Sequence, residues 1–243
     1  MVKTNDMGKF LVLEGTDGSG KGTHTRLLQE WLTNQGIPTA TFDFPRYDEA
    51  SSYFVKQYLN GEYGQLPEIG PYKASLFYAL DRYDAGFRIR TALADDKFVI
   101  CNRYVGSNMG HQGGKISDDT ERAKYFDWVM DMEYKVLQIP RPTLNLVLLM
   151  PAEQSQKFVD LKANRERNYA GGKKRDLHEA DVNHLRHAEA AYRELCRRYP
   201  ETFQSIDCYG NGVLGKIDVI QKQIQNIVTT ELLSERVTNI KEA

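Results

Sequence analysis

The sequence predicts an α/β protein built on a doubly wound, five-stranded parallel sheet. Five short apolar runs, at 10–14, 39–44, 98–101, 144–150 and 203–208, alternate with longer segments of helical pattern. Strands that alternate with helices pair in parallel. The runs at 98–101 and 144–150 show no polar alternation, as expected for strands buried on both faces. Ligands of such sheets bind outside the carboxyl ends of the strands, so those ends are where we expect the site.

The segments between these runs predict the helices in chain order. A helix over 25–35 ends at Gly36 and Pro38, and a second covers 50–60. A long helix runs from 72 to about 94 with Pro71 at its start, where proline is favoured. Further helical patterns cover 108–112, 119–137 and 214–233, and helices flank a basic stretch at 165–175. We find no linker, and expect one domain over 1–243 with its core at about 9–230.

Composition narrows the class of protein. The chain has 243 residues, 41% hydrophobic and 27% charged, which is typical of a soluble globular protein. Its net charge of -1 creates no field that would attract nucleic acid or a membrane, and we expect neither as a partner. Three cysteines without metal-like spacing fit a reducing compartment. No apolar run is long enough to span a bilayer and the first eight residues hold no signal core, so we expect a cytoplasmic enzyme.

A glycine-rich loop follows the first strand and opens a helix. Its glycines let successive backbone N–H groups curl around phosphate oxygens, and the helix N-terminus adds positive potential. Lys21 can reach the outer phosphates. The general P-loop pattern has Ser or Thr after this lysine, whereas this chain has Gly22 and then Thr23, as in the adenylate-kinase branch of P-loop kinases. An ordinary turn before a helix is the alternative. The candidate phosphate-binding residues are Gly15, Thr16, Asp17, Gly18, Ser19, Gly20, Lys21, Gly22 and Thr23.

Two arginines follow the ends of other predicted strands. Arg46 lies in the run Phe44, Pro45, Arg46, Tyr47, and Arg103 follows Asn102. Because a guanidinium grips phosphate with two parallel hydrogen bonds, the pair predicts a second phosphate beside the first. Phosphorylating a hydroxyl would call for a carboxylate base instead. Surface ion pairs are the alternative interpretation for both arginines.

Two polar patterns favour a nucleoside on that second phosphate. Tyr78 and Arg82 are four residues apart, so they share one face of the long helix and could stack on a base and bind its edge. A core aromatic beside a solvated arginine is the alternative. Asn108, His111 and Gln112 form a polar stripe close to Arg103, which is either a substrate contact or a solvated face.

The segment 164–175 is predicted to be a basic loop between helices, and it contains two adjacent glycines. It could close over phosphates as a lid of about 160–178, with Arg165, Arg167 and Arg175 supplying charge in the transition state. Nonspecific surface charge is the alternative. Asp176 and Glu179 have the spacing of a capping box for the helix that follows.

Taken in order, these motifs resemble the thymidylate (dTMP) kinase family over about residues 9–230. The resemblance implies a P-loop kinase fold with a helical lid, ATP and Mg²⁺ as cofactors, dTMP as the acceptor, and a homodimer. It implies that Lys21 and the loop amides hold the ATP phosphates and that Asp17 lies near the acceptor sugar and the metal. Arg46 and Arg103 would hold the dTMP phosphate, and Tyr78 would stack on thymine. The remaining implied substrate contacts are Phe44, Tyr47, Arg82, Asn108, His111 and Gln112, and the lid arginines would act on the transferring phosphoryl group.

The chain departs from the family at three positions. Where the family usually has Phe, this chain has Tyr78, which keeps the stacking but adds a hydroxyl that needs a partner. The family usually has Asp before the arginine of the third strand, and this chain has Asn102. That substitution removes an anion near the metal and raises the weight on Asp17, with Glu179 as a further candidate ligand. Gly22 removes a hydroxyl that Thr23 could replace.

We therefore expect ATP-dependent phosphorylation of dTMP to dTDP, catalysed by Lys21, Arg103, Asp17 and the lid arginines. No general base is needed, because the acceptor phosphate oxygen is already anionic. Alternatives are a kinase of another nucleoside monophosphate and a nucleotide-binding module without turnover. A deoxynucleoside kinase is a weaker alternative, since Asp43 lies one place before Phe44.

Overall fold

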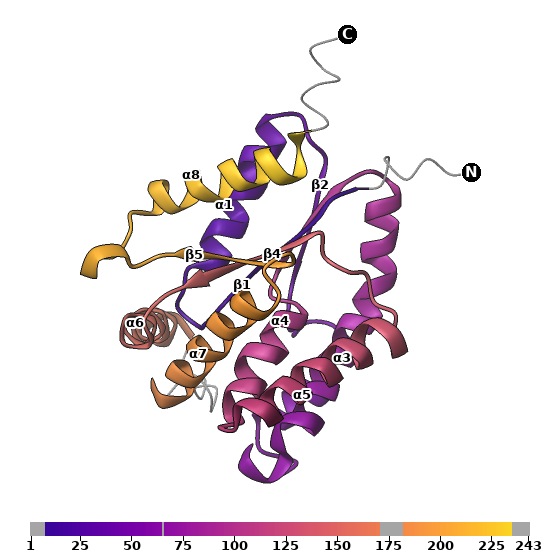
Figure 1. Ribbon diagram of the computed structural model, residues 1–243, viewed down its shortest axis with the longest axis vertical. Coiled ribbons are helices and arrows are strands. Elements are labelled where there is room, and N and C mark those ends of the chain that lie inside the picture. The colour runs from indigo at the N-terminus through magenta and orange to yellow at the C-terminus, as the bar shows by residue number, and fades with distance from the viewer. Residues whose placement is uncertain (1–7, 65, 171–181, 235–243) are drawn as a thin grey trace.

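The computed structural model describes residues 8–64, 66–170 and 182–234, without the side chains at 66–67, 162–170 and 211. Its five strands form one sheet in the order β2-β3-β1-β4-β5, and every neighbouring pair is parallel (Figure 1). This confirms the predicted fold class. The strands are β1 (Phe10–Gly15), β2 (Thr39–Asp43), β3 (Phe98–Asn102), β4 (Leu144–Leu149) and β5 (Phe203–Asp207).

Helices cover both faces of the sheet. Figure 1 shows α1 and α8 on one face and α3, α5 and α7 on the other. The described helices are α1 (Lys21–Asn34), α2 (Tyr53–Leu59), α3 (Leu66–Ala94), α4 (Val105–Ser107), α5 (Asp119–Asp131), α6 (Ala152–Ala170), α7 (Val182–Arg198) and α8 (Ile217–Ile227). None of these helices has the length and apolar character needed to cross a lipid bilayer.

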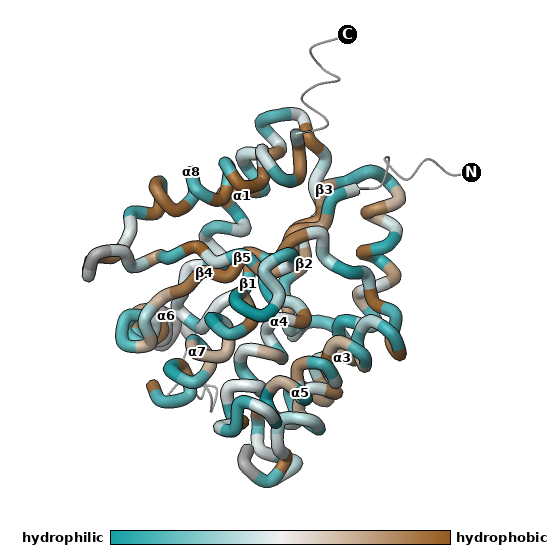
Figure 2. Tube along the Cα trace, viewed as in Figure 1, coloured by the Kyte–Doolittle hydropathy of each residue, from teal (hydrophilic) through white to brown (hydrophobic). Residues whose placement is uncertain are grey.

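The sheet carries a hydrophobic core on each face. Along β1, Leu11 and Leu13 pack toward α1 and α8, while Phe10 and Val12 pack toward α3, α5 and α7. The side chains of β1 are buried throughout, which explains why its sequence shows no polar alternation. Figure 2 shows hydrophobic residues concentrated along the strands in the middle of the molecule, and hydrophilic residues mixed with hydrophobic ones along the helices around them.

The strand order places a crevice at the carboxyl edge. The chain leaves β1 for the edge strand β2, returns to β3 beside β1, and then crosses to β4 on the other side of β1. The loops after β1, β2 and β3 therefore end next to one another. In register, Asp43 at the end of β2 lies opposite Asn102 at the end of β3.

Three helical segments differ from the sequence prediction. The stripe Asn108–Gln112 is a π-helix, and a second π-turn, Met132–Val136, follows α5. The start of α3, by contrast, agrees with the prediction. Gly70 is non-helical (φ 70°), so the regular part of this helix begins near Pro71. The segment from 164 was predicted as a loop, but α6 continues to Ala170. Long unbranched side chains such as Arg165 and Arg167 support helix in that stretch.

Candidate functional site

One cleft of about 980 Å³ lies over the carboxyl ends of the strands. It has a P-loop end, formed by the segment 15–23 that joins the end of β1 to the first turn of α1, and an α3 end, formed by Tyr78 and Arg82. Most of the residues singled out from the sequence line it. These are Asp17, Gly18, Ser19, Gly20, Lys21, Gly22, Thr23, Phe44, Tyr47, Tyr78, Arg82, Arg103, Asn108, His111 and Gln112.

The P-loop owes its shape to glycines with positive φ. Gly18 (φ +80°) and Gly20 (φ +89°) adopt left-handed backbone that other residues rarely tolerate. A β-carbon on Gly18 would lie 2.3 Å from the carbonyl oxygen of Ser155 on α6, so only glycine fits there. Gly15 and Thr16 do not line the cleft. They lie beneath the loop, where the Thr16 hydroxyl shares a hydrogen bond of 3.0 Å with Ser155.

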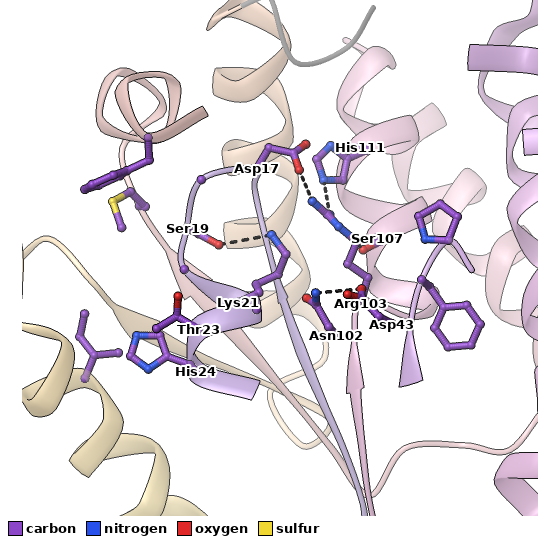
Figure 3. A pocket seen from close by; sticks show the side chains of 18 of the residues that line it. Asp17, Ser19, Lys21, Thr23, His24, Asp43, Asn102, Arg103, Ser107 and His111 are labelled. Atoms are coloured by element: carbon purple, nitrogen blue, oxygen red, sulfur yellow. Dashed lines mark hydrogen bonds and ion pairs between the residues drawn. The ribbon is translucent and has the colours of Figure 1, made fainter. Parts of the chain in front are cut away.

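Lys21 is buried at the start of α1 and points along the loop (Figure 3). Its ammonium donates to the Thr16 carbonyl at 2.7 Å. Burial, together with the charge of Arg103, lowers the pKa of Lys21 to about 7, although Asp17 opposes the shift. An anion bound in the loop would favour the charged form, so proton uptake and phosphate binding are coupled at this lysine.

Arg103 faces Lys21 from the end of β3. It has a positive φ of 66° and an ion pair with Asp17, and its Nη1 donates to His111 Nε2 at 3.0 Å (Figure 3). Burial, the largest single influence, would raise the pKa of Asp17, but the charge of Arg103 together with those of His111, Lys21 and His184 outweighs it, and the net shift is well downward. Burial and Arg103 hold the pKa of His111 well below its usual range, so its Nε2 stays an acceptor. The cluster therefore presents a fixed guanidinium beside the phosphate loop.

A buried carboxylate that the sequence analysis did not single out, Glu14, positions Arg103. Glu14 is fully buried and accepts hydrogen bonds from the Tyr104 and Ser107 backbone N–H groups at 2.8 and 3.0 Å. The hydroxyls of Ser107 and Tyr192 add bonds of 2.7 and 3.1 Å. Glu14 thus fixes the turn that begins at Arg103. A charged residue within the apolar run 10–14 was the signal in the sequence.

At the α3 end a second buried carboxylate organises the polar side chains. Arg82 is 2% exposed and forms a two-pronged ion pair with Glu133, its Nε donating at 2.7 Å. Asn108 donates to the same carboxylate at 3.1 Å. Tyr78 is half-buried and meets the ring of Tyr58 edge-on. Glu133 lies on the π-turn after α5, and nothing in the sequence pattern linked it to this cleft.

His111 and Gln112, two residues of the polar stripe before α5, form hydrogen bonds with residues outside the stripe. Gln112 accepts a hydrogen bond of 2.7 Å from Lys115. His111 shares a hydrogen bond of 3.3 Å between its Nδ1 and Nε2 of His184 on α7. Since His111 Nε2 accepts from Arg103, its Nδ1 carries the proton and donates to His184. His184 also lines the cleft and was missed by the sequence analysis.

Arg46 requires a correction. We expected its guanidinium to share the cleft with Arg103, but it does not line the cleft and turns toward α3. Its Nε donates to Asp81 at 3.0 Å, and its Nη2 donates to Asp84 at 2.6 Å and Ser51 at 2.7 Å. The ion-pair alternative describes its position better, because two carboxylates of α3 lie within reach. Of the predicted lid residues, Arg175 lies outside the described residues, as do the side chains of Arg165 and Arg167.

An apolar lip extends the P-loop end away from Arg103. It consists of Met150, Phe158, Leu161, Leu214 and Ile217, from the segments around α6 and α8. His24 lies at its base, where Nδ1 and Gln221 Oε1 are 2.9 Å apart. A flat apolar ligand group would fit against these side chains. No pattern in the sequence pointed to this lip, because its members come from three separate segments.

The cleft defines the class of protein. A P-loop with a buried lysine faces a guanidinium from the next strand, and an arginine–aromatic pair closes the far end, as a P-loop kinase with a phosphate-bearing acceptor requires.

Comparison with known proteins identifies the family. The family model described as thymidylate kinase matches residues 13–211. The thymidylate kinase of Mycobacterium tuberculosis is 30% identical over 187 residues, which cover 76% of this chain and 85% of that protein. The thymidylate kinase of Pelotomaculum thermopropionicum is 28% identical over 221 residues, which cover 88% of this chain and 92% of that protein. A solved thymidylate kinase from Candida albicans superposes with a TM-score of 0.68 at 19% identity, covering 92% of both chains. The chain belongs to the thymidylate kinase family.

Proposed function

We propose that this protein transfers the γ-phosphoryl group of ATP to the phosphate of dTMP, giving ADP and dTDP. The observation that carries the proposal is that Lys21 and Arg103 line the same cleft. Arg103 forms its ion pair with Asp17 inside this cleft, and not with a carboxylate on the protein surface. Two cations that line the same cleft offset the repulsion between two anionic substrates. Membership of the thymidylate kinase family supplies the reaction class.

The donor nucleotide fits the P-loop end. The loop amides and Lys21 would hold its phosphates, and the apolar lip would cover its base. The acceptor fits the α3 end, with its phosphate at Arg103 and its base between Tyr78 and Arg82. Asn108, His111 and Gln112 lie between these positions, where the sugar would lie. This assignment uses the whole length of the cleft.

Transfer needs positioning and charge more than proton chemistry. The attacking oxygen belongs to a phosphate that is ionised near neutral pH, so no side chain has to remove its proton. Lys21 and Arg103 would neutralise the charge that spreads over the transferring group. Asp17 and Glu14 would keep Arg103 in place. The predicted lid arginines Arg165, Arg167 and Arg175 would add charge from the other side.

The family implies Mg²⁺, which would neutralise charge on the donor phosphates. Among the described residues no group of three or more His, Cys, Asp or Glu side chains could hold a metal alone. This suits Mg²⁺, which usually binds through one or two carboxylates plus substrate phosphates and water. Asp17 is committed to Arg103. Asp43 and Asn102 offer oxygens at the same edge, and the Asn102 Oδ1 is buried without a hydrogen-bond partner in the described part of the chain. These residues fit a hydrated Mg²⁺.

A coupled assay of ADP release tests the proposal. We expect turnover with ATP and dTMP that exceeds turnover with dUMP, UMP, AMP, GMP or CMP, and none with thymidine. Preference for another monophosphate would contradict the acceptor assignment. Binding of ATP and dTMP without any ADP release would contradict the enzymatic role.

A homodimer and a cytoplasmic location belong to the same proposal. Leu76, Leu80, Tyr83 and Phe87 are each 40–55% exposed and share one face of α3. An apolar stripe of this kind suits a second copy of the chain. The three cysteines are free, which supports a reducing compartment.

A further inference from the structure

Asp43 and Asn102, whose oxygens fit a hydrated Mg²⁺, form a polar pair at the carboxyl edge of the sheet. They are register partners at the ends of β2 and β3, and Asn102 Nδ2 donates to Asp43 Oδ1 at 2.9 Å. Both line the cleft. Figure 3 shows the pair on one side of the start of α1, with Thr23 and His24 on the other. Thr23 therefore does not supply a hydroxyl to this side.

The pair leaves acceptor oxygens available. The bond from Asn102 to Asp43 fixes the amide, because the flipped amide would set two oxygens against each other. Oδ1 of Asn102 is then buried and has no hydrogen-bond partner in the described part of the chain. A buried oxygen without a donor costs free energy, so it points to a ligand or water that supplies one.

The absence of a side chain at position 22 leaves room beside these oxygens. A β-carbon on Gly22 would lie 3.9 Å from Asn102 Nδ2. A side cavity of about 240 Å³ lies there, and it shares Gly22, Asp43 and Asn102 with the main cleft. The Thr25 hydroxyl, from another lining residue, is also buried without a partner in the described residues. Since a water takes about 30 Å³ of liquid, several waters fit.

The charge of Asp43 reaches the phosphate site. Burial lowers the pKa of Lys21, and Asp43 is among the carboxylates that oppose this shift. A carboxylate, an amide oxygen and water beside a phosphate loop are the ligands that Mg²⁺ prefers. Asp43 is therefore placed to act on a cation that a nucleotide brings into the loop.

We propose that Asp43, oriented by Asn102, anchors the hydration shell of the divalent cation on the donor nucleotide. The inference rests on the proposed function, since the cation enters with the nucleotide. It assigns the anchoring carboxylate to β2, while β3 supplies an amide that orients it. Gly22 completes this site, because the absence of a side chain at position 22 leaves space for the water molecules bound to the cation.

Mn²⁺ binding measured by electron paramagnetic resonance tests the proposal without turnover. The full chain is titrated with Mn²⁺ in the presence of saturating ADP. We expect Asp43→Asn to weaken Mn²⁺ binding to the ADP complex about 10–100-fold, the usual effect of losing a group that orients a metal site. ADP affinity in EDTA, measured by calorimetry, should stay at the parent value and shows that the variant is folded.

The exchange variant D43N/N102D gives the sharper test. It moves the carboxylate across one hydrogen bond to the neighbouring strand, and we expect it to regain most of the lost Mn²⁺ affinity. Asp95→Asn is the matched control, because Asp95 precedes β3 at the other edge of the sheet and should change nothing. Parent-like Mn²⁺ binding in Asp43→Asn would overturn the proposal. Failure of the parent to phosphorylate dTMP while Asp43→Asn still loses Mn²⁺ would overturn only the proposed function.

Discussion

The two ends of the cleft hold their charged groups by different means. At the P-loop end, the polar groups are the backbone N–H groups of a loop shaped by Gly18 and Gly20 and the buried side chain of Lys21. Because the pKa of Lys21 is about 7, its ammonium is only partly charged near neutral pH. From Arg103 to the α3 end, each arginine that lines the cleft is held by a carboxylate, Arg103 by Asp17 and Arg82 by Glu133. The P-loop end can therefore adapt its charge by taking up a proton. The α3 end has fixed charges, and its side chains are positioned before a ligand arrives.

Replacing the fixed cation nearest the P-loop should have the largest effect. We expect Arg103→Ala to lower kcat about 10³-fold, because it removes charge that acts on the transferring group. Arg103→Gly is the matched control, since glycine suits the positive φ of 66° at this position. Both variants should lose turnover alike in the coupled assay and keep the parent circular dichroism. Near-parent turnover in either would contradict the role of Arg103.

Removing the carboxylate at the α3 end should act on stability first. Glu133→Ala leaves the buried Arg82 charge unpaired, and we expect the free energy of unfolding to fall by about 3–5 kcal/mol in urea denaturation. The double variant Arg82→Met/Glu133→Leu should recover most of that stability, since an apolar pair can replace a buried ion pair. Its KM for dTMP should remain high. A double variant with the parent KM would show that the pair is structural only.

The adaptable charge at the P-loop end predicts a pH dependence. In the free protein the pKa of Lys21 is about 7, and bound phosphate raises it. Above pH 7 the lysine must therefore take up a proton when ATP binds, and ATP affinity should fall about tenfold per pH unit. Below pH 6 the lysine is already charged and the affinity should level off. Calorimetry at pH 8 in buffers of different ionisation enthalpy measures the proton uptake.

Lys21→Arg serves as the control for this prediction, because arginine stays charged over the whole range. It should bind ATP without proton uptake at pH 8. Equal uptake in the parent and in Lys21→Arg would assign the proton to another group.

Arg46 should contribute least to substrate binding. Because its guanidinium is committed to Asp81 and Asp84, we expect Arg46→Met to change the KM for dTMP less than tenfold, against the larger loss expected for a phosphate ligand. The variant should be less stable, since Asp81 is 1% exposed and loses its cation. A large rise in the KM with unchanged stability would restore Arg46 to the phosphate site.

The apolar stripe on α3 predicts an effect on assembly alone. Phe87→Asp should convert a dimer to a monomer in analytical ultracentrifugation, because a charge would face the second copy of the chain. If the parent protein sediments as a monomer at micromolar concentration, the proposed homodimer is contradicted.

The same comparison explains which parts the sequence could predict. The P-loop was predicted in detail because glycines, lysine and helix start are consecutive, and the apolar runs predicted the strands for the same local reason. Glu14, Glu133 and His184 were missed because each acts through a partner far along the chain, as Glu133 does through Arg82, 51 positions away. Arg46 was misplaced for that reason too, since Asp81 lies 35 positions beyond it. The asparagine at 102 was noticed, but only the register shows that it faces Asp43.

The central claim is that the cleft joins two phosphates. Incubation of the protein with γ-³²P-labelled ATP, dTMP and Mg²⁺, followed by separation of the products, tests it most directly. The account predicts that the label appears in the β-phosphate of dTDP in step with ADP formation, and that thymidine in place of dTMP receives none. Label in thymidine monophosphate formed from thymidine, or release of inorganic phosphate without dTDP, would contradict it.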